Sequence, residues 1–358
     1  MIRKTAPITE EKDQTDRSNM LRALEVGASA RARSSPNPWV GCVVLPQGGG
    51  SAFVGATSPP GGPHAEIAAL GRAGSEARGS TVYVTLEPCP HHGRTPPCVD
   101  ALIEAGVRRV VVGVLDPDSR VRGEGVARLR ADGVEVTVGV CEEEVREALA
   151  PYLKHRSSGR PWVILKLAAT LDGRIAAPNG DSAWITGAEA RADVHRLRAT
   201  SDAILVGAGT VRTDDPRLTV RDAPGRSPLR VVLGAIPPGA QVEPALSMGG
   251  DLGTVLDELG AKGIIQLLLE GGAKVAHDFH AAGLIDRYVV YVAPALFGGD
   301  DARSMFAGAG APTMGALWRG RLVGVERLGS DLRVELAPMC VDVVGDLVPL
   351  GAPSAEVV

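Results

Sequence analysis

The chain has 358 residues, of which 44% are hydrophobic and 22% are charged, a balance typical of a folded globular protein. One hydrophobic core rarely serves so long a chain, so we expect two domains. The formal net charge is −4 at pH 7 and no long run of lysine and arginine occurs, which disfavours a nucleic acid as partner. A small anionic ligand remains compatible, because one or two arginines suffice to bind a phosphate.

The N-terminal segment, MIRKTAPITEEKDQTDRSNM, is polar and lacks the apolar core of a secretory signal. No apolar stretch is long enough to span a bilayer, so we expect a cytoplasmic protein without a membrane partner. The five cysteines are odd in number and scattered, which disfavours a disulfide framework. Cys42 and Cys141 follow apolar runs and are interpreted as small buried hydrophobic residues.

Helices and strands are expected to alternate in the first part of the chain. The apolar spacing predicts helices at 19–32, 64–74, 98–107, 125–134 and 142–156, and strands at 40–45, 80–88, 108–116 and 135–140. Such alternation predicts an α/β sheet with helices on its faces. The segment SSGRP, 157–161, has the composition of a linker.

The pattern restarts after this linker. Apolar segments follow at 162–173, 202–210, 229–235, 263–272 and 287–296, and 321–336 is expected to form a closing hairpin. No extra strand is expected between 235 and 263. We therefore predict two α/β domains, 1–157 and 160–358.

The stretch HAEIAAL, 64–70, raises a question about the start of its helix. His64 and Glu66 are two positions apart, about 200° around a helix axis, so they cannot share a face in the middle of a helix. One interpretation is ordinary helix-start chemistry, with Pro63 and an acid in the first turn. The other is that both side chains point into a pocket from the helix N-terminus.

The loop EPCPHHGRTPPC favours the second interpretation. Cys89 and Cys98 follow a predicted strand, where α/β proteins commonly place their chemistry, and thiolates with a histidine suit zinc. Together with HAE they form the His-x-Glu, Pro-Cys and Cys arrangement of zinc-dependent base deaminases, although the cysteine spacing is longer than usual. We therefore expect His64, Cys89 and Cys98 to bind Zn²⁺, with Glu66 as the catalytic proton carrier. The alternative is a closed structural zinc site with His91 or His92 as fourth ligand.

Longer segments carry a more specific resemblance. PNPWVGCVV, GGPHAEIAAL, TVYVTLEPCPHHGRTPPCVDALIEAGVRRVVVGVLDP and VRGEGVARLRADGVEV closely resemble the deaminase half of the bifunctional riboflavin-biosynthesis deaminase–reductase family, in which the longer cysteine spacing is the rule. The resemblance implies a cytidine-deaminase-like, three-layer α/β/α domain in which Asn37 contacts the pyrimidine and His91, His92 and Arg94 line the pocket. Thr57 stands where the family usually has a histidine, which puts one substrate or helper contact in doubt.

The second half shows a similar resemblance. LLLEGGAKVAHDF predicts a buried strand that ends in two glycines before a helix, a suitable cradle for a phosphate, although it is not the Gly-x-Gly-x-x-Gly of a Rossmann domain. With ILKLAATLDGRIA, DSAWITG and RLRATSDAILVGAGTVRTDDPRLTVR, it resembles the reductase half of the same family, whose fold is like that of dihydrofolate reductase and whose cofactor is NADPH.

This resemblance implies two sets of contacts in the second domain. Arg198 and Arg221 are plausible clamps for a ribose phosphate, since guanidinium pairs with phosphate bidentately. Lys166 alternates with apolar residues on a predicted strand, so it is either exposed or directed at a phosphate; the resemblance favours the second, and Lys166 is grouped with the cofactor contacts. The implied cofactor contacts are Lys166, Ala168, Trp184, Thr210, Asp214, Gly272, Ala273, Lys274, Val275, Ala276, His277 and Asp278, and the implied substrate contacts are Ser182, Arg198, Leu218, Arg221 and Glu270.

One region departs from the family. Gly234 and Ala235 replace an Asp-Ser pair that often follows this strand, and the chain between 235 and 263 is short. We therefore expect the outer part of the cofactor site to be trimmed, which weakens the expected preference for NADPH over NADH.

The resemblance thus implies two consecutive reactions on one small phosphoribosyl-pyrimidine. The first is zinc-dependent hydrolytic deamination of 2,5-diamino-6-(5-phosphoribosylamino)pyrimidin-4-one, and the second is NADPH-dependent reduction of its ribosyl side chain to ribityl. A homo-oligomer is expected. The alternatives are a deaminase of cytidine or of an RNA adenosine, and a non-catalytic, zinc-stabilised binding module. NADPH oxidation that depends on a deaminated substrate would separate them.

Overall fold

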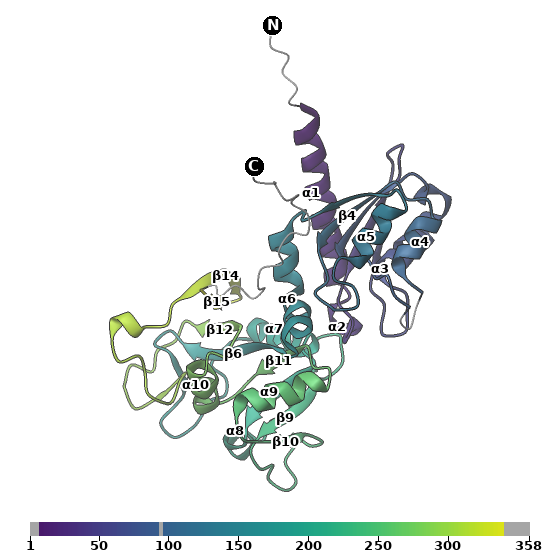
Figure 1. Cartoon of the computed structure of the whole chain (residues 1–358). Helices are drawn as coiled ribbons and strands as arrows, with labels where there is room; N and C mark the ends of the chain where they lie inside the picture. Colours follow the sequence, from purple (N-terminus) through teal and green to yellow (C-terminus); the bar gives the residue numbers. More distant parts are fainter. Residues whose placement is uncertain (1–6, 93–95, 340–358) are drawn as a thin grey trace, which may run out of the picture.

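The computed structural model describes residues 7–92 and 96–339, with side chains from residue 12 onward. Two α/β units, each built on its own sheet, lie on either side of helix α6 (Glu142–Ser158) (Figure 1). No helix in the described ranges is both long and apolar enough to cross a membrane.

The first unit contains a five-stranded sheet in the order β2-β1-β3-β4-β5. Strand β1 is antiparallel to both of its neighbours, whereas β3, β4 and β5 are parallel. All four strands expected from the sequence are confirmed. The additional strand β2 has four residues, too few for alternation to be recognised. The strands are β1 (Gly41–Leu45), β2 (Phe53–Ala56), β3 (Thr81–Leu86), β4 (Arg109–Val114) and β5 (Glu135–Val138).

Helices cover both faces of this sheet, which confirms the three-layer α/β/α prediction. Helices α1 and α6 contact each other and the sheet on one face, and α3, α4 and α5 form the other layer (Figure 1). The first helix begins earlier than expected, because its first turns are polar and carry no apolar period. The helices are α1 (Pro7–Ala28), the short α2 (Arg31–Ser34), α3 (Ala65–Ala73), α4 (Cys98–Glu104) and α5 (Glu124–Ala131), with a 3₁₀ turn at Gly74–Ala77.

The second unit contains an eight-stranded sheet in the order β10-β9-β8-β11-β6-β12-β15-β14. The first six strands are parallel, and the last two form the expected closing hairpin. The expectation of no extra strand between 235 and 263 is wrong, because the three residues of β10 pair with β9 at the sheet edge. The strands are β6 (Trp162–Thr170), β8 (Ala203–Gly207), β9 (Leu229–Leu233), β10 (Leu246–Met248), β11 (Gln266–Leu269), β12 (Arg287–Ala293), β14 (Gly320–Leu328) and β15 (Asp331–Pro338).

Two hydrophobic cores lie on the two faces of this sheet. Val163 and Leu165 of β6 pack in one core with residues of α9 and α10, whereas Ile164 packs in the other with residues of α7 and α8. Because side chains alternate along a strand, Lys166 shares the face of Ile164. The helices are α7 (Ala188–Ala199), α8 (Ala208–Asp214), α9 (Leu252–Ala261) and α10 (Ala273–Ala281), with a short strand pair β7 (Arg174–Ala176) and β13 (Arg303–Ser304) and a 3₁₀ turn at Met314–Ala316.

The last turns of α6 connect the two units. Lys154 forms an ion pair with Asp286 beside β12, and Nε2 of His155 lies 3.1 Å from the carbonyl oxygen of Gly260 in α9. The helix ends at Gly159, whose positive φ of 74° favours glycine. A Cβ on Gly260 would lie 1.8 Å from the carbonyl oxygen of Gly159, so the two backbones meet with no room for a side chain.

We propose that residues 1–157 and 160–358 are separate domains, and we predict that a fragment from residue 160 folds. The fragment keeps the whole eight-stranded sheet and both of its cores but loses the contacts of α6. It should therefore melt in one cooperative transition, at a lower temperature than the corresponding transition of the whole chain, when followed by circular dichroism. An insoluble fragment, or one without a cooperative transition, would contradict the proposed boundary.

Candidate active sites

Three potential metal ligands meet at the start of two helices in the first unit. His64 is the N-cap of α3 and Cys98 is the first residue of α4, while Cys89 lies in the loop after β3. Nδ1 of His64 is 3.6 Å from Sγ of Cys89 and 3.3 Å from Sγ of Cys98. The three ligand atoms all lie within 4.8 Å of one another.

These distances fit a tetrahedral zinc ion. With Zn–S bonds of about 2.3 Å and Zn–N bonds of about 2.0–2.1 Å, a tetrahedral angle separates sulfur from nitrogen by about 3.5 Å. The backbone N–H of Cys98 also donates to Sγ of Cys89 at 3.4 Å, an interaction that favours the thiolate. The donor set and its spacing therefore suit zinc, and a three-ligand site leaves one position open.

Glu66 lies beside these ligands, and the helix start resolves the geometric problem that the sequence raised. The backbone of His64 is extended, with φ −71° and ψ 167°, so its side chain is not bound by helical spacing. Both residues line the same cavity. The side chain of Glu66 is buried, and this burial raises its pKa to about 7.

The cavity in front of Glu66 has a volume of about 440 Å³, within the usual range for small-molecule sites. Asn37, Thr57 and His91 line it, whereas His92 is exposed. The hydroxyl of Thr57 accepts the N–H of Val40 at 3.1 Å, so this residue fixes the backbone beside the cavity. Arg94 falls outside the described residues.

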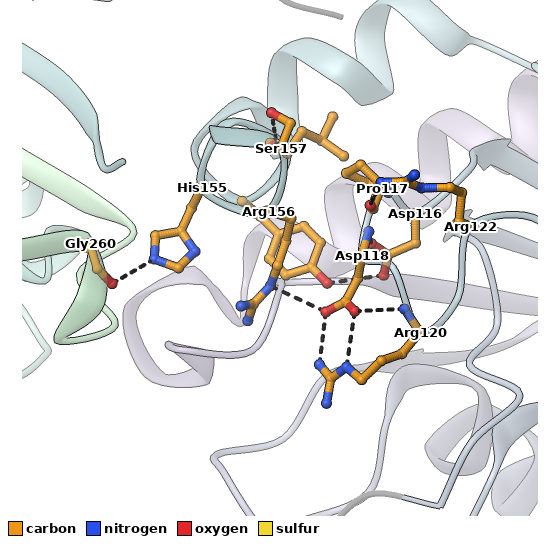
Figure 2. Close-up of polar contacts among 11 residues, drawn as sticks. Asp116, Pro117, Asp118, Arg120, Arg122, His155, Arg156, Ser157 and Gly260 are labelled. Carbon is orange, nitrogen blue, oxygen red and sulfur yellow. Dashed lines mark hydrogen bonds and ion pairs between the residues drawn. The ribbon is translucent and has the colours of Figure 1, made fainter. Parts of the chain in front are cut away.

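Sequence reasoning missed the far wall of this cavity, which Figure 2 shows in part. Asp116 and Asp118 follow β4, and Tyr152 and Arg156 come from α6. The phenol of Tyr152 donates to Asp116 at 3.0 Å. The position of the aspartates just after a parallel strand was a signal for them, since ligands bind beyond the carboxyl ends of such strands.

Glu87 also lines the cavity, but its hydrogen bonds indicate a structural role. Its buried carboxylate accepts N–H groups from Asp116, Gly123 and Val126 at 3.2, 2.9 and 3.1 Å. It thereby holds the loop after β4 and the start of α5 against the end of β3. Three backbone donors leave little capacity for a substrate contact.

The second unit has two neighbouring cavities, of about 960 and 930 Å³, which share several lining residues. Most residues that the family resemblance implies are brought together here. The first cavity is lined by Ser182, Thr210, Asp214, Gly272, Ala273, Lys274, Val275 and Asp278, and the second by Lys166, Ala168, Ser182, Trp184, Arg198, Thr210, Asp214, Leu218, Arg221, Glu270 and Gly272.

Two residues that the resemblance implies as cofactor contacts line neither cavity. Ala276 is fully buried in the core beneath α10 and offers no surface to a ligand, so the expectation of a cofactor contact there is wrong. The ring of His277 stands against Gly308, where a Cβ would meet it at 2.1 Å. Helical spacing explains Ala276, because a contiguous run of helix residues cannot all face one cavity.

Bare glycine backbone borders the shared part of the two cavities. Gly272 is the N-cap of α10, and its N–H donates to Oγ1 of Thr210 at 3.1 Å. A Cβ on Gly271 would lie 2.8 Å from Cβ of Val275, and one on Gly207 would lie 2.8 Å from its Cγ2. The close approach of these segments leaves a helix N-terminus open toward the cavity, a geometry that suits the phosphates of a dinucleotide.

Arg198 and Glu270 are bound to each other. Nε and Nη2 of Arg198 donate to the two carboxylate oxygens of Glu270 at 2.6 and 2.8 Å, and Nη1 donates to the carbonyl oxygen of Thr219 at 3.2 Å. Burial raises the pKa of Glu270, but the hydrogen bonds from Arg198 outweigh it and hold this pKa below its usual value. Arg198 is therefore not a free phosphate clamp, contrary to the simplest interpretation of the sequence.

Lys166 lies close to this ion pair. Its ammonium nitrogen is 5.9 Å from the centre of the Tyr291 ring. Burial lowers the pKa of Lys166, and the Glu270 carboxylate opposes that shift. Such an environment is typical of functional sites. Nearby, Trp184 is 76% exposed, with the guanidinium of Arg191 4.8 Å from its ring centre, so this large aromatic surface is open to a ligand.

Comparisons with known proteins agree with both sites. Residues 13–114 match the cytidine and deoxycytidylate deaminase zinc-binding region, and residues 161–334 match the RibD C-terminal domain. The riboflavin biosynthesis protein RibD of Mycobacterium tuberculosis (strain H37Rv) is 43% identical over 324 residues, which cover 88% of this chain and 95% of that protein. RibD of Escherichia coli (strain K12) is 36% identical over 364 residues, which cover 90% of this chain and 99% of that protein.

Solved structures show the same two-domain arrangement. Acinetobacter baumannii RibD has a TM-score of 0.85 at 38% identity, over 92% of this chain and 100% of that chain. A diaminohydroxyphosphoribosylaminopyrimidine deaminase/5-amino-6-(5-phosphoribosylamino)uracil reductase from Thermotoga maritima has a TM-score of 0.81 at 36% identity, with the same coverage. The predicted cytidine-deaminase-like and reductase folds are thus confirmed. The chain belongs to the RibD family of bifunctional riboflavin-biosynthesis enzymes, which join a zinc-dependent deaminase to an NADPH-dependent reductase.

Proposed function

We propose that the first domain deaminates 2,5-diamino-6-(5-phosphoribosylamino)pyrimidin-4-one with zinc bound by His64, Cys89 and Cys98. The observation that carries this assignment is the meeting of one imidazole nitrogen and two sulfurs beside the buried Glu66. Zinc bound there would act as a Lewis acid and make a water molecule nucleophilic at neutral pH. The remaining roles in the proposed reaction are assigned to side chains of the protein itself.

Glu66 is the proton carrier of the proposed deamination. It lines the cavity next to the ligands and is held by the first turn of α3, so it can take a proton from water and deliver it to the departing ammonia. Its burial excludes bulk water from that path. Asn37 lines the same cavity and is assigned to the pyrimidine edge, because its amide offers both a donor and an acceptor.

We assign the two cavities of the second domain to NADPH and the deaminated substrate. The glycine backbone at the start of α10, with Thr210 and Lys274, is assigned to the cofactor phosphates, while Ala168, Trp184, Asp214, Ala273, Val275 and Asp278 border the rest of the cofactor. NADPH supplies the hydride, and the protein orients it toward the ribosyl carbon. Ser182, Leu218 and Arg221 are assigned to contacts with the substrate. The Arg198–Glu270 pair is assigned to the wall that the cofactor and the substrate share.

The remaining parts of the proposal concern assembly and location. We infer a homo-oligomer, because the edge strand β14 exposes Leu322 and Val325 by 57% and 56%, and its partner β15 exposes Leu332 by 41%. A cytoplasmic location is inferred from the paired zinc thiols, which need a reducing compartment. The net charge of −4 supports a small-molecule substrate over a nucleic acid.

One prediction tests the proton carrier. Glu66→Gln keeps the shape of the side chain but cannot carry a proton, so ammonia release should fall about 10²- to 10⁴-fold while zinc is retained. Zinc is measured by plasma mass spectrometry on the same preparation. Glu104→Gln, an exposed change at the end of α4, is the matched control and should keep the wild-type rate.

The variant His64→Ala distinguishes the role of a zinc ligand from that of the proton carrier. It should lose both zinc and ammonia release, whereas the reductase rate on substrate that is already deaminated should stay unchanged in both variants. Retention of most of the deaminase rate in Glu66→Gln would mean that Glu66 is only a helix-start acid.

A second prediction tests the Arg198–Glu270 pair by a double-mutant cycle. Arg198→Gln or Glu270→Gln alone leaves a charge with 9–13% side-chain exposure without its partner, which should cost about 3–5 kcal/mol in the free energy of unfolding. The double variant should cost clearly less than the sum of the two changes, as measured by urea unfolding. Additive costs would show that the two side chains act independently.

A further inference from the structure

Two arginines line the deaminase cavity, on segments other than the one that carries Glu66. Among the described residues that line this cavity, the arginines are Arg120, from the loop after β4, and Arg156, from the last turn of α6. Both lie against one carboxylate, that of Asp118 (Figure 2). The same cavity is therefore lined by His64, Glu66 and Cys89 and by two guanidinium groups.

The acceptors on this wall are already used. The carboxylate of Asp118 accepts Nε and Nη2 of Arg120 at 2.9 and 2.8 Å, and also the backbone N–H of Arg120 at 3.1 Å. Asp116 accepts the N–H of Asp118 at 2.9 Å and the phenol of Tyr152 at 3.0 Å. Hydrogen bonds from Arg120 hold the pKa of Asp118 down at about 2, so this carboxylate is charged throughout the physiological range.

The hydrogen-bond donors on this wall, in contrast, outnumber the acceptors that face them. Arg156 approaches Asp118 only to 3.7 Å through Nε, beyond hydrogen-bond distance, and that buried nitrogen has no hydrogen-bond partner in the described part of the chain. The side chain of Arg156 also interacts with the phenol oxygen of Tyr152, whereas Nη1 of Arg120 has no hydrogen-bond acceptor among the described residues. The partner that this wall lacks is an acceptor, and guanidinium groups match the oxygens of a phosphate.

The surroundings hold Arg156 in place. Its guanidinium lies 5.1 Å from the ring centre of Tyr152, one turn earlier in α6. His155 and Lys154, the residues before it, contact Gly260 and Asp286 of the reductase domain (Figure 2 shows His155 and Gly260). With a side-chain exposure of 27%, Arg156 is partly ordered before any ligand binds, which lowers the entropic cost of binding.

We propose that Arg156 and Arg120 form the subsite that recognises the phosphate of the deaminase substrate, with Asp118 as the residue that positions them. This inference rests on the proposed deaminase function, since it places the pyrimidine at Glu66 and the phosphoribosyl group across the cavity. It makes the phosphate a determinant of specificity for the first reaction as well as for the second.

The test compares phosphorylated substrate with the same compound after phosphatase treatment. Ammonia release is measured on the zinc-loaded whole chain without NADPH, so the phosphate-binding reductase cavity does not contribute. Wild-type kcat/KM should fall roughly 10- to 150-fold when the phosphate is removed, the range expected for charge-assisted hydrogen bonds. Arg156→Gln and Arg120→Gln/Arg156→Gln should lose most of this preference through KM, while their kcat/KM on the dephosphorylated compound matches that of the wild type.

Two variants are matched controls. Arg122→Gln changes a neighbouring exposed residue of the same loop, and Arg146→Gln changes a partly exposed residue of α6 that pairs with Glu142; both should keep the wild-type preference. Reductase activity on deaminated substrate serves as the check that each variant is folded. Ribose 5-phosphate gives a second readout: it should inhibit deamination of the dephosphorylated compound by the wild type, and inhibit Arg156→Gln at least tenfold less.

Two outcomes would overturn the proposal. An unchanged preference in the double variant would show that the phosphate is held elsewhere, and an equal loss on both compounds would show that the arginines are only structural. A zinc-loaded wild-type chain that releases ammonia from neither compound would overturn the proposed deaminase function itself, which distinguishes that failure from the other two.

Discussion

The deaminase domain depends on the convergence of three side chains from separate segments at one point. His64, Cys89 and Cys98 are brought within 4.8 Å of one another by the start of α3, the end of β3 and the start of α4. In the absence of metal this arrangement is costly, since Cys98 is buried and Cys89 lies beside it. Zinc bound by these three side chains, as proposed, would convert that cost into stabilisation, because thiolates and imidazole bind it tightly. The position of Glu66 follows from the same convergence, since it lies on α3 two residues beyond a ligand.

The reductase domain depends on a different constraint, the alternation of side chains along a buried strand. On β6, odd-numbered residues pack beneath α9 and α10, which places Lys166 on the opposite face with Tyr291. Glu270 follows the neighbouring strand β11 and is neutralised by Arg198. A lysine and an ion pair in so buried a position are costly to desolvate, which is typical of residues kept for function.

Sequence patterns predicted the elements that have strong periods and the residues that belong to local motifs. The strands of both sheet centres, the hairpin at the end and the meeting of His64, Cys89 and Cys98 were of this kind. The short strands β2, β7 and β10 escaped prediction, because three or four residues cannot display a period. Partners distant in the chain also escaped it: nothing in the sequence indicated that Arg198 binds Glu270, or that Arg156 of α6 meets Asp118 after β4. Ala276 was wrongly assigned to the cofactor because the 3.6-residue period of a helix turns part of any contiguous run away from one cavity.

Helix α6 gives the two activities a shared structural element. Its last turns contribute Tyr152 and Arg156 to the deaminase cavity and Lys154 and His155 to contacts with the reductase domain. Neither cavity is formed by residues of both domains, but the wall of the first is built on a helix that the second domain holds. One helix therefore both lines the first site and contacts the domain that carries the second.

Zinc K-edge X-ray absorption on the zinc-loaded whole chain tests the central claim most directly. A catalytic site with His64, Cys89 and Cys98 predicts two sulfur ligands at about 2.3 Å, one imidazole at about 2.0–2.1 Å and one further light atom from solvent. A second imidazole in place of that atom would mean a closed structural site. That result would contradict a zinc centre that activates water beside Glu66.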